Sequence, residues 1–143
     1  MKTLRYLLLA LLIAAPVLPA CAADWVLIAN PKAGVGHLSQ DDVTNIYLGR
    51  YRRLASGLTA EPIDQPGDSL LKARFYRQLV DKNLAEINAY WARLVFSGKT
   101  RPPRVVASEE DAVQFVARNL DALAYVDKSM VDARVSVVFS MSE

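Results

Sequence analysis

The stretch that decides the fold is EPIDQPGDSLLKARF, residues 61–75. It begins as a short apolar strand, turns at Pro66 and Gly67, and continues as an amphipathic helix capped by Asp68 or Ser69. A strand, a turn and a helix in this order aim unpaired N–H groups and the positive end of the helix dipole at one spot. Such a spot can hold an oxyanion, but this one lacks the charged and hydroxyl side chains that strengthen a site of this kind.

Strands and helices alternate on both sides of this stretch. Short apolar runs predict strands at 25–29, 60–64, 104–107, 122–126 and 135–139. Helical spacing predicts helices that start near Ser39, Ser69, Leu84 and Ser108. This alternation implies an α/β fold with a mostly parallel sheet flanked by helices, and Pro62 suggests that its strand lies near an edge.

Two loops are candidates for a binding site, because ligands of parallel sheets bind outside the carboxyl ends of the strands. Residues 30–39 and 65–69 both follow strands, so we expect these loops to meet. The candidate ligand-binding residues are Asn30, Ser39, Gln65, Gly67 and Ser69. Plainer interpretations stay open: the serines as helix caps, Asn30 as the start of a turn, and Gln65 as a solvated polar residue.

The first residues have the pattern of a targeting segment. Lys2 and Arg5 precede an apolar run from Leu7 to Leu18, followed by small residues. The run is shorter than the roughly 20 residues that a spanning helix needs. The pattern predicts a secretory signal peptide over 1–23, one domain over 24–143, and export to the periplasm. Cys21, the single cysteine, is either a lipid-bearing first residue of a lipoprotein or part of the removed peptide.

Charge and motifs narrow the function classes. The chain has 17 basic and 15 acidic residues, and two of the basic ones lie in the predicted signal peptide, so the domain is near neutral. This balance argues against nucleic acid as a partner. Arg50, Arg52 and Arg53 form either an anion patch or docking surface, or a solvated helix end. With His37 as the single histidine and no known catalytic or cofactor motif, we expect no enzyme activity, cofactor or metal site.

Three segments carry a resemblance to a known family. LSQDDVTNIYLGR (38–50) resembles the LTxxxLxxIFLGK helix of the phosphate-binding component of phosphate ABC transporters. Residues 61–75 resemble its strand, phosphate loop and helix, and NLDALAYVD (119–127) is similar to its NPGAIGYVE segment. Small single-lobe exported proteins of the same superfamily share the VLIANP opening and the YWARLVFSGKxxPP middle.

The resemblance implies one lobe of a type 2 periplasmic-binding-protein fold, with phosphate or a similar oxyanion as ligand and an inner-membrane transporter or sensor as partner. The family's phosphate loop reads RSDGSGTT. Here Gln65 stands at its Arg position and Gly67 at its Asp position, and Ser69 keeps its identity. A lost charge-assisted Arg contact costs about 1.5–3 kcal/mol, so we expect weak binding.

A second hypothesis is a non-binding adaptor that keeps the fold. Full receptors close two lobes around the ligand, and this chain is long enough for one. A single lobe exposes the face that the other would cover, so it can dock on a membrane complex or self-associate. A symmetric homodimer would restore a two-lobed cleft.

Overall fold

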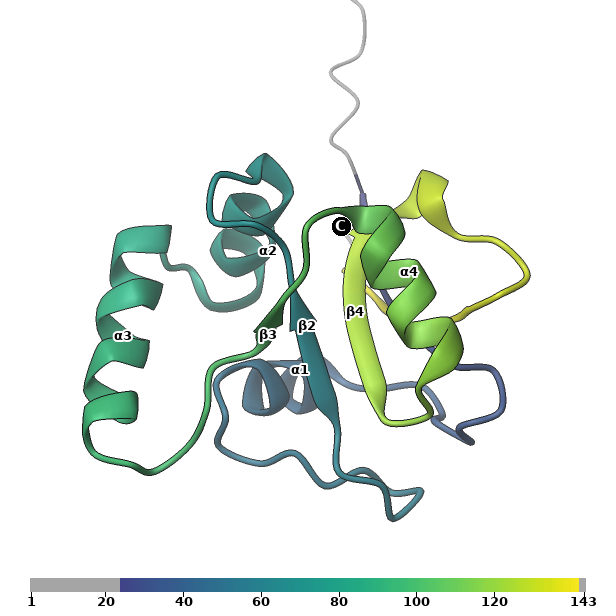
Figure 1. Cartoon of the computed structure of the whole chain (residues 1–143), viewed down its shortest axis with the longest axis horizontal. Helices are drawn as coiled ribbons and strands as arrows, with labels where there is room; N and C mark the ends of the chain where they lie inside the picture. The colour runs from purple at the N-terminus through teal and green to yellow at the C-terminus, as the bar shows by residue number, and fades with distance from the viewer. Residues whose placement is uncertain (1–23, 142–143) are drawn as a thin grey trace, which may run out of the picture.

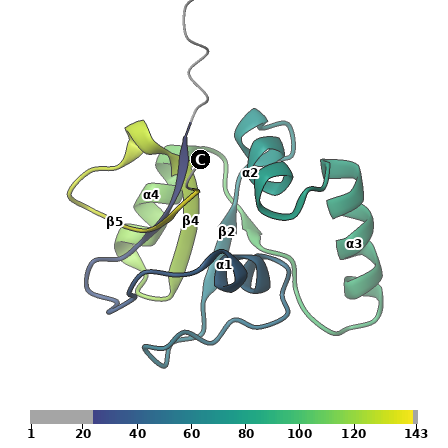
Figure 2. The same cartoon turned by 180° about the vertical axis from the view of Figure 1, so that it is seen from behind.

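The computed structural model describes residues 24–141. The predictions for the signal peptide and for Cys21 concern residues outside this range. The strands are β1 (Trp25–Ala29), β2 (Glu61–Asp64), β3 (Arg104–Val105), β4 (Ala122–Asp127) and β5 (Ser136–Ser140). They form one sheet in the order β3-β2-β4-β1-β5. Figure 1 labels β3, β2 and β4 of this sheet, and Figure 2 labels β5.

Four strands of this sheet share one direction, and β1 runs against them. β2 is parallel to β3 and β4, while β1 is antiparallel to both β4 and β5. The predicted mostly parallel sheet is confirmed, with β1 as the exception. The prediction that the strand with Pro62 lies near an edge is confirmed, because β2 is the neighbour of the edge strand β3. The short strand β3 pairs with Ile63 and Asp64 alone, so Pro62 lies outside that ladder.

Helices cover both faces of the sheet. One face carries α1 (Gln40–Tyr47), α2 (Leu70–Val80) and α3 (Leu84–Phe96), and the other carries α4 (Glu109–Arg118). Figure 1 views the molecule from the α4 side, and Figure 2 views it from the side of α1 and α2. A short 3-10 helix, η1 (Lys128–Met130), follows β4.

Aromatic rings hold α1 and α2 against the sheet. Phe75 of α2 stacks on Tyr125 of β4 with ring centroids 3.7 Å apart, and Trp25 and Tyr47 meet Phe75 edge-on at 4.7 and 4.8 Å. All four side chains are buried. Pairs of this geometry add stabilisation beyond the area that they bury. These contacts therefore hold α2 against β4, β1 and α1.

Each helix begins at a capping side chain. Ser39 and Ser69 accept hydrogen bonds from the backbone N–H groups of Asp42 and Lys72, and Ser108 accepts one from Asp111. These predicted N-caps are confirmed. Asn83 caps α3 in the same way.

Candidate functional site

The turn between β2 and α2 has the shape expected of an anion-binding loop. Its chain closes on itself, because the Ser69 N–H donates to the Pro66 carbonyl at 2.9 Å. The Ser69 hydroxyl accepts from the Lys72 N–H at 3.2 Å, which starts α2. Leu70, the first helical residue, points its side chain into solvent and is 84% exposed.

Four backbone N–H groups at this turn have no protein acceptor in the described part of the chain. They belong to Gly67, Asp68, Leu70 and Leu71. Unpaired N–H groups in the first turn of a helix carry part of the positive end of its dipole. These amides are the donors that this loop can offer to a ligand.

The stronger donors beside the loop already hold a carboxylate of the protein itself. Asp64, the last residue of β2, is 4% exposed. Its Oδ1 accepts from the Gln65 N–H at 2.9 Å and from the hydroxyl of Tyr125. Its Oδ2 accepts from the Tyr76 hydroxyl at 3.0 Å and lies 3.3 Å from Nζ of Lys72. Asp64 is thus an internal anion with its bonding capacity filled.

The tyrosines around Asp64 stay protonated. Burial raises the pKa of Tyr47, Tyr76 and Tyr125 above the ordinary value, and the nearby Asp64 carboxylate raises each further. The Tyr47 hydroxyl donates to the carbonyls of Ile63 and Leu123 at 2.9 and 3.2 Å. These hydroxyls therefore act as permanent donors within the core.

The side chain of Gln65 faces inward. Gln65 is 1% exposed, and its amide nitrogen donates to the carbonyl of Tyr125 at 3.0 Å. The prediction that Gln65 is a solvated residue is wrong, because the side chain satisfies the backbone of β4 instead. Gly67 remains exposed at the tip of the turn.

The two predicted loops do not meet, and that expectation is wrong. Asn30 follows β1, which runs antiparallel to β4, whereas Gln65 follows β2, which runs parallel to β4. Their carboxyl ends therefore lie at opposite ends of the sheet. The side-chain amide of Asn30 donates to the carbonyls of Val116 and Ala117 at the end of α4, at 3.1 and 3.0 Å.

Ser39 is placed apart from the β2 loop as well. It forms a reciprocal capping box, in which its hydroxyl accepts from the Asp42 N–H while Asp42 Oδ2 accepts from the Ser39 N–H. The N–H of the preceding residue, Leu38, donates a hydrogen bond to the carbonyl of Val138 on β5. β5 lies on the far side of the sheet from β2. Of the predicted residues, Gln65, Gly67 and Ser69 share one loop.

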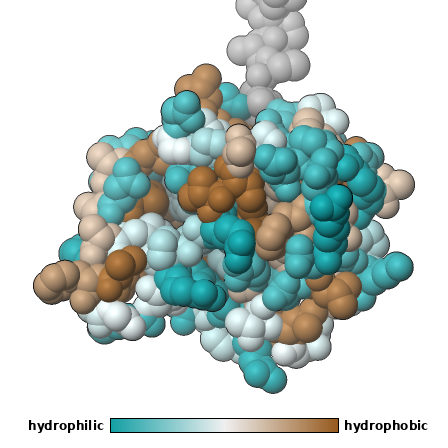
Figure 3. Space-filling view, in the orientation of Figure 1, coloured by the Kyte–Doolittle hydropathy of each residue, from teal (hydrophilic) through white to brown (hydrophobic). Residues whose placement is uncertain are grey.

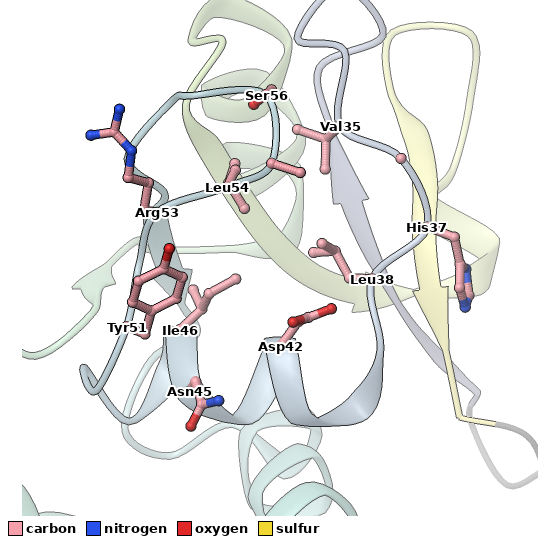
Figure 4. A pocket seen from close by; sticks show the side chains of 12 residues that line it. Val35, His37, Leu38, Asp42, Asn45, Ile46, Tyr51, Arg53, Leu54 and Ser56 are labelled. Carbon is pink, nitrogen blue, oxygen red and sulfur yellow. The ribbon is translucent and has the colours of Figure 1, made fainter.

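A hollow of about 180 Å³ lies elsewhere, between residues 35–38, α1 and residues 51–56. Figure 4 shows Leu38, Leu54 and Val35 around it, with the Asp42 carboxylate at its base and the Arg53 guanidinium turned outward. None of the predicted site residues lines it. Its lining holds both the Asp42 carboxylate and the Arg53 guanidinium.

The residues that surround the β2 loop, Asp64, Lys72 and Tyr76, were not among the predicted site residues. The signal available was Asp64 directly before the loop, but the sequence does not show what a carboxylate will face. Tyr125 was predicted to pack in the core, and it does. In residues 24–141, no group of His, Cys, Asp and Glu is arranged to hold a metal, and no helix is long and apolar enough to cross a membrane.

Comparison with solved structures identifies the class of fold. An ABC-type phosphate transport receptor from Vibrio cholerae superposes with a TM-score of 0.64 at 16% identity, over 80% of this chain and 45% of the receptor. A putative phosphate ABC transporter substrate-binding protein from Clostridium perfringens, solved with bound phosphate, gives 0.64 at 18% identity, over 80% and 44%. PstS from Borrelia burgdorferi gives 0.59 at 12% identity, over 80% and 46%.

The chain therefore has the fold of one lobe of a phosphate-receptor-like periplasmic binding protein, as the resemblance implied. It spans less than half the length of each of these relatives. No protein-family model and no curated protein matches the sequence.

Proposed function

We propose that this protein is an exported single-lobe relative of phosphate ABC transporter substrate-binding proteins and binds a small oxyanion, phosphate or similar, with low affinity. The binding groups are the free amides of Gly67, Asp68, Leu70 and Leu71 at the start of α2. The observation that carries the proposal is this row of unpaired N–H groups, on a strand, turn and helix unit of the receptor fold.

Low affinity follows from the surroundings of the loop. Lys72, the cation nearest to the α2 cap in sequence, is paired with Asp64 and is 9% exposed. No arginine side chain stands in the loop itself. Main-chain amides then act without a charged partner, and a charged partner roughly doubles the strength of such a hydrogen bond.

Leu70→Pro tests this site by removing one amide. Proline is well tolerated at the first position of a helix, and the extended backbone of Ser69, at φ −68° and ψ 125°, suits a residue that precedes proline. Leu70→Ala is the matched control, because it trims the same exposed side chain and keeps the N–H. Isothermal titration with phosphate should give weaker binding for Leu70→Pro than for Leu70→Ala. Equal affinities would remove the α2 amides from the proposal.

The second candidate function is an interaction module, and two observations favour it. Lys72, the cation nearest to the loop in sequence, is already paired with Asp64. Val95 and Phe96, neighbours at the end of α3, are 54% and 96% exposed. On the face of the molecule seen in Figure 3, hydrophobic and hydrophilic residues are interspersed, without one broad apolar patch.

Size-exclusion chromatography with light scattering separates the two candidates. A constitutive dimer that Phe96→Ser converts to a monomer would support the interaction module. A dimer that forms on addition of phosphate would support the binding protein, with the cleft completed by a second copy.

A further inference from the structure

Three arginines gather at the opposite end of β2 from the loop just described. They line a cavity of about 230 Å³ whose walls are Arg52, Glu61, Pro62, Arg101, Pro102 and Arg104. Glu61 is the first residue of β2 and Gln65 follows its last, so the length of the strand separates this cavity from the α2 amides. In Figure 1 the segments after α1 and after α3 both approach β2 and β3 from the lower side.

Backbone carbonyls hold Arg52 in place. Its Nε donates to the carbonyl of Ile46 near the end of α1 at 3.2 Å, and its Nη2 donates to the carbonyl of Arg101 at 2.7 Å. Neither acceptor carries a full charge, so the guanidinium is fixed without being neutralised. Its remaining N–H groups have no acceptor within residues 24–141.

Arg104 is positioned by a carboxylate and a ring. Its Nε lies 3.1 Å from Oε1 of Glu61, and its guanidinium sits 5.2 Å from the centroid of the Phe115 ring. The Arg101 side chain is exposed and makes no hydrogen bond or ion pair with the described residues. Glu61 is the single acidic residue in the lining, so the cavity has an excess of two positive charges.

Burial is the main influence on the pKa of Arg52. Partial burial lowers the pKa of Arg52; Glu61 opposes this effect, and the neighbouring Arg101 adds to it by a smaller amount. Like charges brought together in a partly desolvated place are stabilised by a bound anion. Planar guanidinium groups match tetrahedral oxyanions because each can offer parallel N–H donors.

We propose that the cavity lined by Arg52, Arg101 and Arg104 is a binding site for a small doubly charged oxyanion such as sulfate or hydrogen phosphate. Arg52 and Arg104 are the positioned donors, and Arg101 completes the site. The proposal does not depend on the α2 amides, because its groups lie at the other end of β2.

Isothermal titration with sodium sulfate and sodium phosphate, at ionic strength held constant with sodium chloride, tests the site. Arg101→Gln should weaken sulfate binding about tenfold or more, the usual effect of one charged hydrogen bond. Arg53→Gln is the matched control: Arg53 is an exposed arginine close in the chain to Arg52, and it lines the other hollow. It should bind sulfate as the wild type does.

Glu61→Gln should change sulfate affinity in the opposite direction to Arg101→Gln. It removes the one negative charge of the lining and keeps an oxygen for Arg104, so sulfate affinity should rise severalfold. The proposal is overturned if the wild type gives no heat with millimolar sulfate, if Arg101→Gln behaves like Arg53→Gln, or if Glu61→Gln binds more weakly. Leu70→Pro reports on the α2 amides alone, so failure of either site is visible separately.

Discussion

The Asp64 carboxylate and the Lys72 ammonium group form a buried ion pair, with Oδ2 and Nζ 3.3 Å apart and side chains 6% and 11% exposed. The pair joins the end of β2 to the first turn of α2. It places a charge of the protein where the resemblance to phosphate receptors led us to expect a ligand. The donors on the buried side of the loop are therefore occupied by Asp64. The backbone amides on its exposed side remain available to a ligand.

Lys72→Met should destabilise the fold by about 3–5 kcal/mol, because it leaves the Asp64 charge buried without its cation. The matched control is Arg77→Met on the same helix, which breaks the exposed pair between Arg77 and Asp81. Pairs of that kind contribute about 0.3–0.5 kcal/mol. Urea unfolding of both variants measures the difference, and similar midpoints would contradict a structural role for the Asp64–Lys72 pair.

Stability should fall as the pH rises above about 10, the ordinary pKa of tyrosine. The pKa values of Tyr47, Tyr76 and Tyr125 are raised in the folded state, chiefly by burial. Above that pH the unfolded chain releases protons that the folded chain keeps, and this difference favours unfolding. Each such group adds a slope of up to about 1.4 kcal/mol per pH unit.

Circular dichroism and tyrosinate absorbance, followed together during an alkaline titration, check this prediction. The three buried tyrosines should ionise with unfolding rather than before it. Tyr47→Phe removes one of the groups and should make the loss of stability less steep. Ionisation of all tyrosines while the fold is intact would count against the buried network.

Asn30→Ala should lower the free energy of unfolding by about 2–4 kcal/mol and leave phosphate affinity unchanged. The side-chain nitrogen of Asn30 donates to the carbonyls of Val116 and Ala117. Its Oδ1 accepts from the Lys32 N–H in the turn after β1 at 2.9 Å. Loss of these bonds leaves buried acceptors unpaired. Asn30→Asp, which keeps the acceptor and turns an oxygen toward the two carbonyls, should be no more stable than Asn30→Ala. A drop in phosphate affinity with no change in stability would instead restore Asn30 as a ligand residue.

Gly49→Ala should be more damaging than Gly34→Ala, although both glycines have a positive φ, +69° and +67°. A side chain at either position is strained by roughly 1–2 kcal/mol. At Gly49 the added Cβ would also lie 2.9 Å from atoms of Thr100 and Trp91, whereas at Gly34 nothing lies within 4 Å. Crowding of this kind costs about 1–3 kcal/mol more. Thermal melts of the two variants compare them directly. Equal melting temperatures would mean that the side chains of Thr100 and Trp91 move away from the added Cβ at no cost in stability.

The sequence by itself determined the elements, because their signals are local. A capping serine followed by a helical apolar face defines the starts of α1, α2 and α4. Short apolar runs between turn residues define the strands, and motifs within these elements carry the resemblance to the receptor lobe. Each of these features depends on residues a few positions apart.

Tertiary structure alone decided how the elements face one another. The apolar run of β1 fits either strand direction, so no local sequence feature predicts its antiparallel pairing with β4. This pairing places Asn30 at the opposite end of the sheet from Gln65. The same holds for Asp64 and Tyr125, and for Arg52 and Arg104, which meet across 61 and 52 positions of the chain respectively. Contacts at such separations are set by how the helices pack on the sheet, and the chemistry of both proposed sites depends on them.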